Sequence, residues 1–263
     1  MKQAIVVIGL GEMGSVFARG LLRLGHPLYP VIRGTALETV AQQVPDPLLV
    51  LVAVAENDLH PVLENIPTAW QRHIVLLQNE LLPKDWQQYE WSKAIAPTVI
   101  SVWFEKKKGQ DSKVLIPSPV YGGQAQTIHD ALATLDIPVT VLKNSEQLEL
   151  ELVIKNVYIL TTNIAGLALE KMGLETAANV ETLWQKHQDL AKTIANEVID
   201  IQECLTGKTF NRDTLIKGMH TAMLGDPEHK CMGRSAPARL ERALKIAKDA
   251  ALNPAQLLKI AST

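Results

Sequence analysis

The chain has 263 residues, of which 47% are hydrophobic and 21% charged, so its composition predicts a globular protein and excludes a disordered one. Its formal net charge of -2 gives no global reason to expect nucleic acid or a membrane surface as a partner. Two cysteines, Cys204 and Cys231, cannot form a disulfide framework, and no Cys/His spacing suggests a metal site. We therefore expect a cytoplasmic protein with no metal and no membrane span.

The first part of the chain alternates short β-branched runs with helical stretches, which predicts a mainly parallel sheet covered by helices. The expected strands are residues 4–8, 28–32, 48–54, 73–77 and 99–103, with 114–117 and 139–142 completing the sheet. Helices are expected over 15–24 and 37–44. Only about a dozen residues separate Arg33 from the strand at Leu48, which leaves no room for a full third βα repeat.

A charged segment between the expected strands, Glu105 to Gly109, is interpreted as a hairpin tip. It contains three consecutive lysines, and such charge runs are usually solvent-facing. A solvated turn is therefore the favoured interpretation of these lysines, with a phosphate-binding role as the alternative.

After Asn144 the composition becomes helical. Ser145 is the expected N-cap of a long helix that Gly173 ends. A second long helix is expected over residues 180–205, followed by helices over 213–223 and 236–251 and a short helix opened by Pro254. The predicted organisation is a Rossmann-type α/β domain over residues 1–144 and an all-α domain over residues 145–263.

A glycine fingerprint follows the first expected strand: Gly9, Leu10, Gly11, Glu12, Met13 and Gly14. In the first turn of a βαβ unit, the first glycine makes the turn, the second admits a pyrophosphate and the third allows close packing of helix on strand. The pyrophosphate then lies at a helix N-terminus. An ordinary glycine turn is the alternative, but the flanking strand and helix favour a dinucleotide site.

The end of the second expected strand distinguishes the two nicotinamide dinucleotides. NAD-binding folds place an acid there to bind the ribose 2′-hydroxyl, whereas this chain has Arg33, 19 residues after Gly14. A guanidinium matches a 2′-phosphate, so the sequence predicts NADP(H). A solvated arginine at a strand end is the alternative.

These and later motifs resemble those of the ketopantoate reductase-like proteins, a branch of the 6-phosphogluconate dehydrogenase C-terminal-like superfamily. The resemblance rests on the glycine turn and Arg33, and on segments around Val52-Ala53-Val54, Leu77-Gln78-Asn79, Lys155 with Asn163, and Ala222-Met223-Leu224-Gly225-Asp226. It implies NADPH-dependent reduction of a 2-keto acid, with Lys155 as proton donor, Asn163 beside it and Asn79 among the cofactor-binding residues.

The chain also departs from the family pattern. Glu80 stands where the family has a glycine, and Ile159 where it has an asparagine. Thr221 and Ala222 replace its paired serines, and Arg234 falls near the position of its substrate-binding glutamate. The resemblance therefore implies the fold and the cofactor, but it argues against ketopantoate as the substrate.

The residues around Lys155 are also chemically suited to carbonyl reduction, because a lysine in an apolar stretch can donate the proton that an alkoxide needs. Thr162 nearly eclipses Lys155 on a helix, and Asn163 lies about 80° around it. A lysine that reaches the surface or pairs with Glu149 or Glu151 is the alternative.

Two further residues are candidates for substrate binding. Arg234 could hold an acidic group, with a solvated loop as the alternative. Glu241 could replace the lost glutamate, although a surface pair with Lys245 explains it equally well.

Two functions follow from these observations. The first is an NADP(H)-dependent oxidoreductase, acting on CH–OH groups, that reduces a small keto or imino acid. The second is a non-catalytic NADP(H)-binding sensor or interaction protein. We expect a small-molecule substrate as partner and a homodimer as the assembly.

Overall fold

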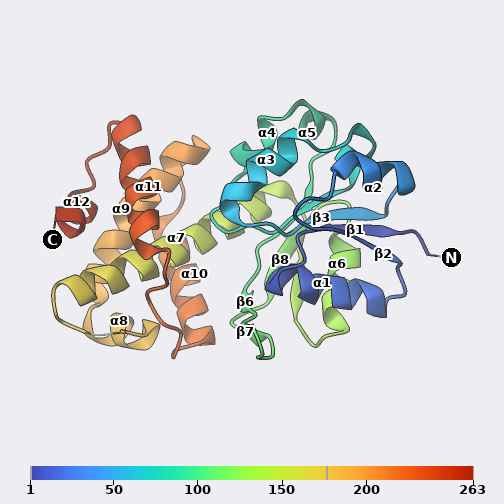
Figure 1. The fold of residues 1–263 in the computed structure, drawn as a ribbon. Helices are drawn as coiled ribbons and strands as arrows, with labels where there is room; N and C mark the ends of the chain where they lie inside the picture. Colours follow the sequence, from blue (N-terminus) through green and yellow to red (C-terminus); the bar gives the residue numbers. More distant parts are fainter. Residues whose placement is uncertain (1, 176, 263) are drawn as a thin grey trace. The chain divides into compact units, whose positions relative to one another are not determined.

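The computed structural model describes residues 2–175 and 177–262, which divide into two compact units, residues 1–152 and 153–263. The first unit holds a seven-stranded sheet and the second is helical (Figure 1). The predicted fold class, a Rossmann-type sheet followed by a helical region, is confirmed.

The sheet has the order β2-β1-β3-β4-β5-β8-β9. Its strands are β1 (Ile5–Ile8), β2 (Leu28–Val31), β3 (Leu49–Val52), β4 (Ile74–Leu76), β5 (Thr98–Ile100), β8 (Ser118–Tyr121) and β9 (Val139–Val141). The first five strands are mutually parallel, and β8 runs antiparallel to β5. The carboxyl ends of β1 to β5 therefore lie along one edge of the sheet. Only one helix and no further strand separates β2 from β3, so the prediction that a full third βα repeat is missing here is confirmed, and β2 is the outer strand.

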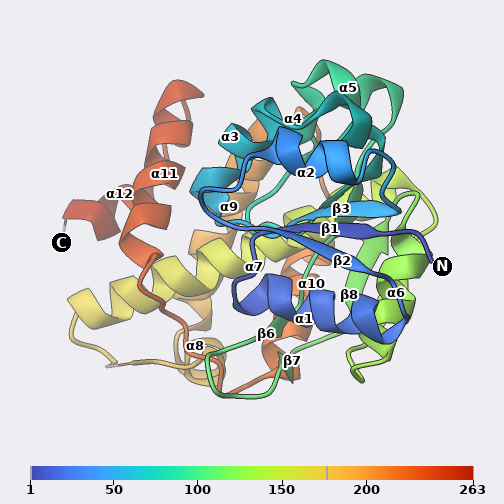
Figure 2. The same cartoon turned by 45° about the vertical axis from the view of Figure 1, so that its right-hand side comes forward.

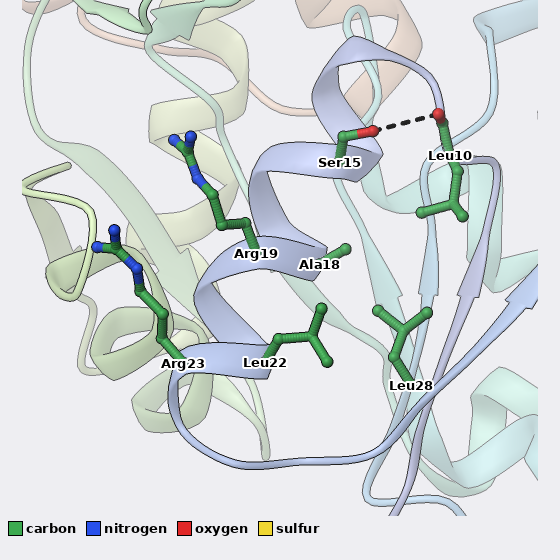
Figure 3. A pocket seen from close by; sticks show the side chains of 7 residues that line it. All are labelled: Leu10, Ser15, Ala18, Arg19, Leu22, Arg23 and Leu28. Atoms are coloured by element: carbon green, nitrogen blue, oxygen red, sulfur yellow. Dashed lines mark hydrogen bonds between the residues drawn. The ribbon is translucent and has the colours of Figure 1, made fainter.

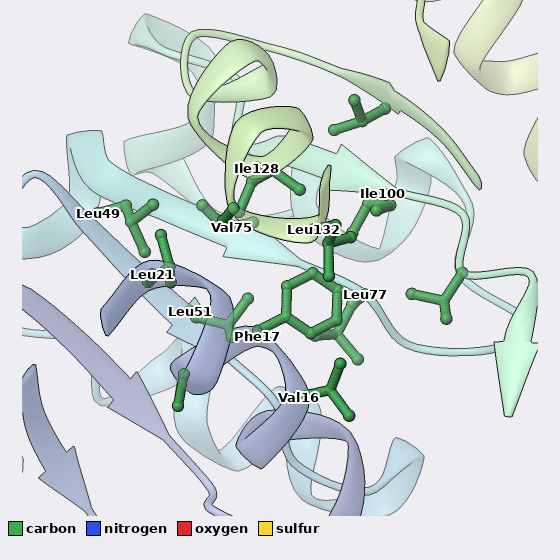
Figure 4. Close-up of a cluster of buried hydrophobic side chains, with 14 of the residues drawn as sticks. Val16, Phe17, Leu21, Leu49, Leu51, Val75, Leu77, Ile100, Ile128 and Leu132 are labelled. Carbon is green, nitrogen blue, oxygen red and sulfur yellow. The ribbon is translucent and has the colours of Figure 1, made fainter. Parts of the chain in front are cut away.

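Helices cover both faces of this sheet (Figure 2). On one face lie α1 (Glu12–Arg23) and α6 (Ala125–Ala133), and on the other α2 (Leu37–Gln43), α3 (Leu59–Glu64), α4 (Pro83–Gln87) and α5 (Glu90–Ala94). Phe17 of α1 is fully buried among aliphatic side chains from the sheet and α6 (Figure 4). This core fixes α1, and with it the glycine turn, on the sheet.

A separate hairpin follows β5. It consists of β6 (Phe104–Glu105) and β7 (Lys113–Val114), which pair in antiparallel register. The predicted hairpin tip is confirmed, but the prediction that residues 114–117 complete the main sheet is wrong. That role belongs to β8, which the prolines at 117 and 119 conceal because a residue without an N–H is a poor strand signal.

The long helix α7 (Ser145–Lys171) begins in the first unit and continues into the second. Asn144 caps it, since its Oδ1 accepts a hydrogen bond from the Gln147 N–H at 2.9 Å; the expectation that Ser145 is the cap is wrong. Gly173 has a φ of +65° at the turn that follows the helix. By length and composition α7 could cross a membrane, but 94% of its most apolar window is buried, as in the core helix of a globular protein.

The remaining helices of the second unit are α8 (Val180–Lys186), α9 (Gln188–Thr206), α10 (Arg212–Gly225), α11 (Ala236–Asp249) and α12 (Ala255–Ser262). The single helix predicted over residues 180–205 is therefore wrong. His187, with φ −129° and ψ 33°, interrupts it. Neither glycine nor proline marks the break, so the sequence gives no local signal for it.

Candidate functional site: the glycine turn and the polar face of α7

The glycine turn joins β1 to α1, and two of its glycines are required by close contacts within the chain. Gly9 has a φ of +91°, and a Cβ there would lie 2.6 Å from the carbonyl oxygen of Ala53 on the neighbouring strand's end. A Cβ on Gly14 would lie 2.0 Å from the Gly9 carbonyl oxygen. The fold itself therefore leaves no room for a side chain at either position.

Gly11 differs from these two because a Cβ there would meet no atom within 4 Å. It is the N-cap of α1, with an extended φ and ψ, and no side chain caps the helix there. The fold alone does not require a glycine at this position. An open approach to an uncapped helix N-terminus suits the backbone contacts that a pyrophosphate makes, so these residues fit a dinucleotide.

Arg33 lies just beyond β2, in a tight turn where the Thr35 N–H donates to the Ile32 carbonyl at 2.9 Å and Gly34 has a φ of +86°. The guanidinium is exposed and has no ion-pair partner among residues 2–175 and 177–262. Because β1 and β2 are parallel neighbours, Arg33 and the glycine turn share the carboxyl edge of the sheet.

The segment after β4 lies along the same edge. Gln78 is buried, and its Nε2 donates to the Val52 carbonyl at 2.7 Å, which ties the end of β4 to the end of β3. The next residue, Asn79, is exposed. Glu80 has a φ of +57° at the position where the family pattern has a glycine, so the turn keeps a left-handed backbone although the residue has changed.

A surface pocket of about 460 Å³ borders the glycine turn along the flank of α1 (Figure 3). Its lining is mainly aliphatic, with Arg19 and Arg23 on the helix side: Leu10, Ser15, Ala18, Arg19, Leu22, Arg23 and Leu28. The Ser15 hydroxyl donates to the Leu10 carbonyl at 3.2 Å. Of the predicted cofactor residues Leu10 lines this pocket, whereas Arg33 and Asn79 are not among its lining residues.

The predicted site residues of α7 are buried in the middle of the helix. Lys155 is only 4% exposed, and Thr162 and Asn163, about two turns further on, are also buried. The Thr162 hydroxyl donates to the Tyr158 carbonyl at 2.8 Å, and Asn163 Nδ2 donates to the Ile159 carbonyl at 2.8 Å. The side chains of Thr162 and Asn163 therefore each make at least one hydrogen bond to the backbone of their own helix.

Asn163 also holds the loop that carries Arg234, because its Oδ1 accepts the Gly233 N–H at 3.3 Å. One turn further on, a Cβ on Gly166 would lie 2.9 Å from the Cβ atoms of Cys231 and Met232, so the loop lies directly on the helix. Burial raises the pKa of the Cys231 thiol to about 12, which makes it unreactive at neutral pH.

Arg234 itself is exposed in the turn before α11, and Glu241 is exposed on that helix. The structure does not show the alternative for Glu241, a surface pair with Lys245: the Lys245 ammonium lies 3.0 Å from Asp249, one turn later. Within the described ranges, Arg234 and Glu241 have no ion-pair partner.

The favoured interpretation of the three hairpin lysines is that they are solvent-exposed, and the structure confirms this for two of them. Lys107 and Lys108 are exposed, but the side chain of Lys106 is only 18% exposed and its ammonium lies 3.6 Å from the Glu12 carboxylate. The sequence of three consecutive lysines does not indicate which of them faces α1.

No protein-family model and no curated protein matches this sequence. Solved structures do match, along nearly the whole chain. The 2-dehydropantoate 2-reductase of Methylococcus capsulatus is 16% identical with a TM-score of 0.64, and the match covers 98% of this chain and 94% of that one.

The dimeric ketopantoate reductase of Staphylococcus aureus is 17% identical with a TM-score of 0.60, covering 98% and 96% of the two chains. A D-mandelate dehydrogenase in complex with NADH is 13% identical with a TM-score of 0.65, with the same coverage. The chain has the ketopantoate reductase fold. At these identities the ketopantoate reductase likeness extends to the fold and not to the substrate.

Proposed function

We propose that this chain is an NADP(H)-dependent oxidoreductase that reduces a small keto or imino acid other than ketopantoate, in the cytoplasm. The observation that carries the proposal is the glycine turn. Gly9 and Gly14 are enforced by contacts within the chain, whereas Gly11 faces open space and has no structural need to be glycine. A glycine kept where packing does not require it fits a ligand whose phosphates approach the backbone.

Arg33 supports NADP(H) as the dinucleotide. Its guanidinium is exposed at the end of β2, beside the turn, and no acid stands there to bind a 2′-hydroxyl. The D-mandelate dehydrogenase of the same fold is described with NADH, so the fold does not exclude NADH and the proposal of NADP(H) depends on the residue at this position. Asn79, exposed after β4, is a second proposed contact.

The cofactor preference is tested with Arg33→Ala. We expect wild type to bind NADPH more tightly than NADH, and the variant to lose roughly 10- to 100-fold in NADPH affinity while NADH affinity changes little, because only the 2′-phosphate needs the guanidinium. Fluorescence titration of both cofactors measures this. Equal affinities of the wild type for the two cofactors would contradict the proposal.

Lys155 is the proposed proton donor. The bound cofactor supplies a hydride, and reduction of a carbonyl then requires a proton at the new alkoxide oxygen. Lys155 is buried on α7, and a lysine ammonium can donate that proton. Thr162 and Asn163 position the substrate and the loop beside the lysine, and Arg234 binds an acidic substrate group. Glu241 is the alternative contact on α11.

The mechanism is tested with Lys155→Ala, after a panel of keto and imino acids has been screened by loss of NADPH absorbance. We expect kcat to fall by about 10²–10⁴ while NADPH affinity is nearly unchanged, as for loss of a general acid. Lys217→Ala, which removes an exposed lysine of α10, is the matched control. Normal turnover by the Lys155 variant would refute the assignment.

One observation favours the second candidate function, a non-catalytic NADP(H)-binding protein. Ala222, at the position of one of the family's paired serines, is fully buried in α10, so this position offers a substrate no hydroxyl. Tight NADPH binding together with no reduction of any acid in a broad panel would favour this candidate.

A further inference from the structure

The β6–β7 hairpin is anchored on α1 close to the glycine turn. The Phe104 ring of β6 lies against the Phe17 ring of α1, with 6.0 Å between the ring centroids, and both side chains are buried. Lys106 follows directly after β6, and its ammonium lies 3.6 Å from the carboxylate of Glu12, the first residue of α1. The hairpin therefore contacts α1 at Phe17 and, nearer the N-terminus of that helix, at Glu12.

The side chain of Lys106 is held there by three contacts. Its ammonium donates to the carbonyls of Lys107, at 2.9 Å, and Gln110, and it lies 3.6 Å from the carboxylate of Glu12, the first residue of α1. Its neighbour Lys107 has a side chain that is 68% exposed and pairs instead with Glu105 of the same hairpin. One of the two lysines is therefore directed at the glycine turn and the other is not.

The contact with Glu12 has a direct consequence for anion binding. A carboxylate in the first turn of a helix interacts favourably with the helix dipole, but it also repels any other anion that approaches the same N-terminus. The Lys106 ammonium compensates this charge. At 3.6 Å the contact is an ion pair and too long for a hydrogen bond, so within the described residues the ammonium makes two hydrogen bonds and can donate a third.

We propose that Lys106 is a pyrophosphate-binding residue, which donates from the β6–β7 hairpin to the phosphate oxygens held by the glycine turn. This inference rests on the proposed dinucleotide binding. It adds a cation that acts on the part of the ligand common to NADP and NAD, whereas Arg33 acts on the 2′-phosphate alone. The two roles make different predictions for the same set of ligands.

Calorimetric titration of Lys106→Met with NADP⁺, NAD⁺ and adenosine 2′-monophosphate tests the proposal. We expect both dinucleotides to bind about tenfold more weakly, as for loss of one charge-assisted hydrogen bond, and adenosine 2′-monophosphate, which has no pyrophosphate, to bind as it does to wild type. Lys107→Met removes the same charge from the same hairpin and should leave all three affinities unchanged. Thermal unfolding of both variants checks that they are folded.

A second pair of variants separates contact with the ligand from neutralisation of Glu12. In a Glu12→Gln background there is no carboxylate to compensate, so Lys106→Met should still weaken both dinucleotides if the ammonium touches the pyrophosphate. Loss of the effect in that background would overturn the proposal, as would equal affinities for the Lys106 and Lys107 variants. Wild type that binds neither dinucleotide would instead overturn the proposed function, and this inference with it.

Discussion

At the scale of single residues, the three glycines of the turn illustrate two different reasons for the absence of a side chain. A Cβ on Gly9 would lie 2.6 Å from the Ala53 carbonyl oxygen, and a Cβ on Gly14 would lie 2.0 Å from the Gly9 carbonyl oxygen, so neither position has room for a side chain. A Cβ on Gly11 would meet no atom of the described residues within 4 Å. Packing therefore explains two glycines of the motif, and the proposed dinucleotide explains the third.

The glycine pair gives a matched test. Gly14→Ala should lower the free energy of unfolding by about 1–3 kcal/mol, since the added methyl group overlaps the Gly9 carbonyl. Gly11→Val should leave stability within about 1 kcal/mol but abolish NADPH binding, because its side chain occupies the approach of the pyrophosphate. Denaturant unfolding and fluorescence titration measure the two effects. Unchanged NADPH affinity in a folded Gly11→Val protein would contradict the assignment of the turn.

At the scale of secondary-structure elements, a hydrogen bond at the start of α4 and the burial of the same residue have opposite effects on the pKa of Asp85. The Leu82 N–H donates to Asp85 Oδ2 at 2.7 Å at the start of the helix, an interaction that favours the ionised carboxylate. Burial outweighs it and raises the pKa of Asp85 above its ordinary value of 3.8, although the backbone bond, Lys84 and His60 act in the opposite direction.

The raised pKa predicts the sign of a pH dependence. Between pH 3.8 and the raised pKa, Asp85 binds more protons in the folded protein than in the unfolded chain. Its contribution to the free energy of unfolding therefore falls as pH rises through this range. Relative to Asp85→Asn, which cannot titrate, wild type should lose about 1–3 °C in Tm as pH rises from 3.8 into the neutral range. Parallel melting curves of the two proteins measure this, and a difference that does not change with pH would contradict it.

At the scale of the whole molecule, the expected assembly is a homodimer. Cyclic two-fold dimers are the commonest closed assembly of soluble proteins. The long helix predicted over residues 180–205 would offer a continuous surface to a second copy, but it is in fact two helices, α8 and α9, with His187 between them. The dimer is therefore proposed without assigning it to a single continuous helix.

Sedimentation velocity at micromolar concentrations tests the assembly. The chain has a mass of 28.9 kDa, so a dimer should sediment with twice that mass, with and without NADP⁺. A single species of monomer mass under both conditions would end the proposal.

The sequence by itself determined the division into a sheet-forming first part and a helical second part, and the place of the glycine turn, because both depend on local chemistry. Alternating β-branched and helical stretches predict parallel strands, and Gly9, Gly11 and Gly14 mark the turn through their spacing. Arg33 is likewise found from its position after the second strand. The predicted helix over residues 180–205 failed because the chain bends at His187 without a glycine or proline to signal it.

Only the tertiary structure decided which glycines the fold requires, which hairpin lysine faces α1, and how the loop before α11 is held. These depend on contacts between residues distant in sequence: Gly9 with Ala53, Lys106 with Glu12, and Asn163 with Gly233. A run of three lysines looks the same in sequence whichever one is turned inward. Burial of the Phe104 ring against Phe17 fixes the hairpin on α1, and that packing selects Lys106.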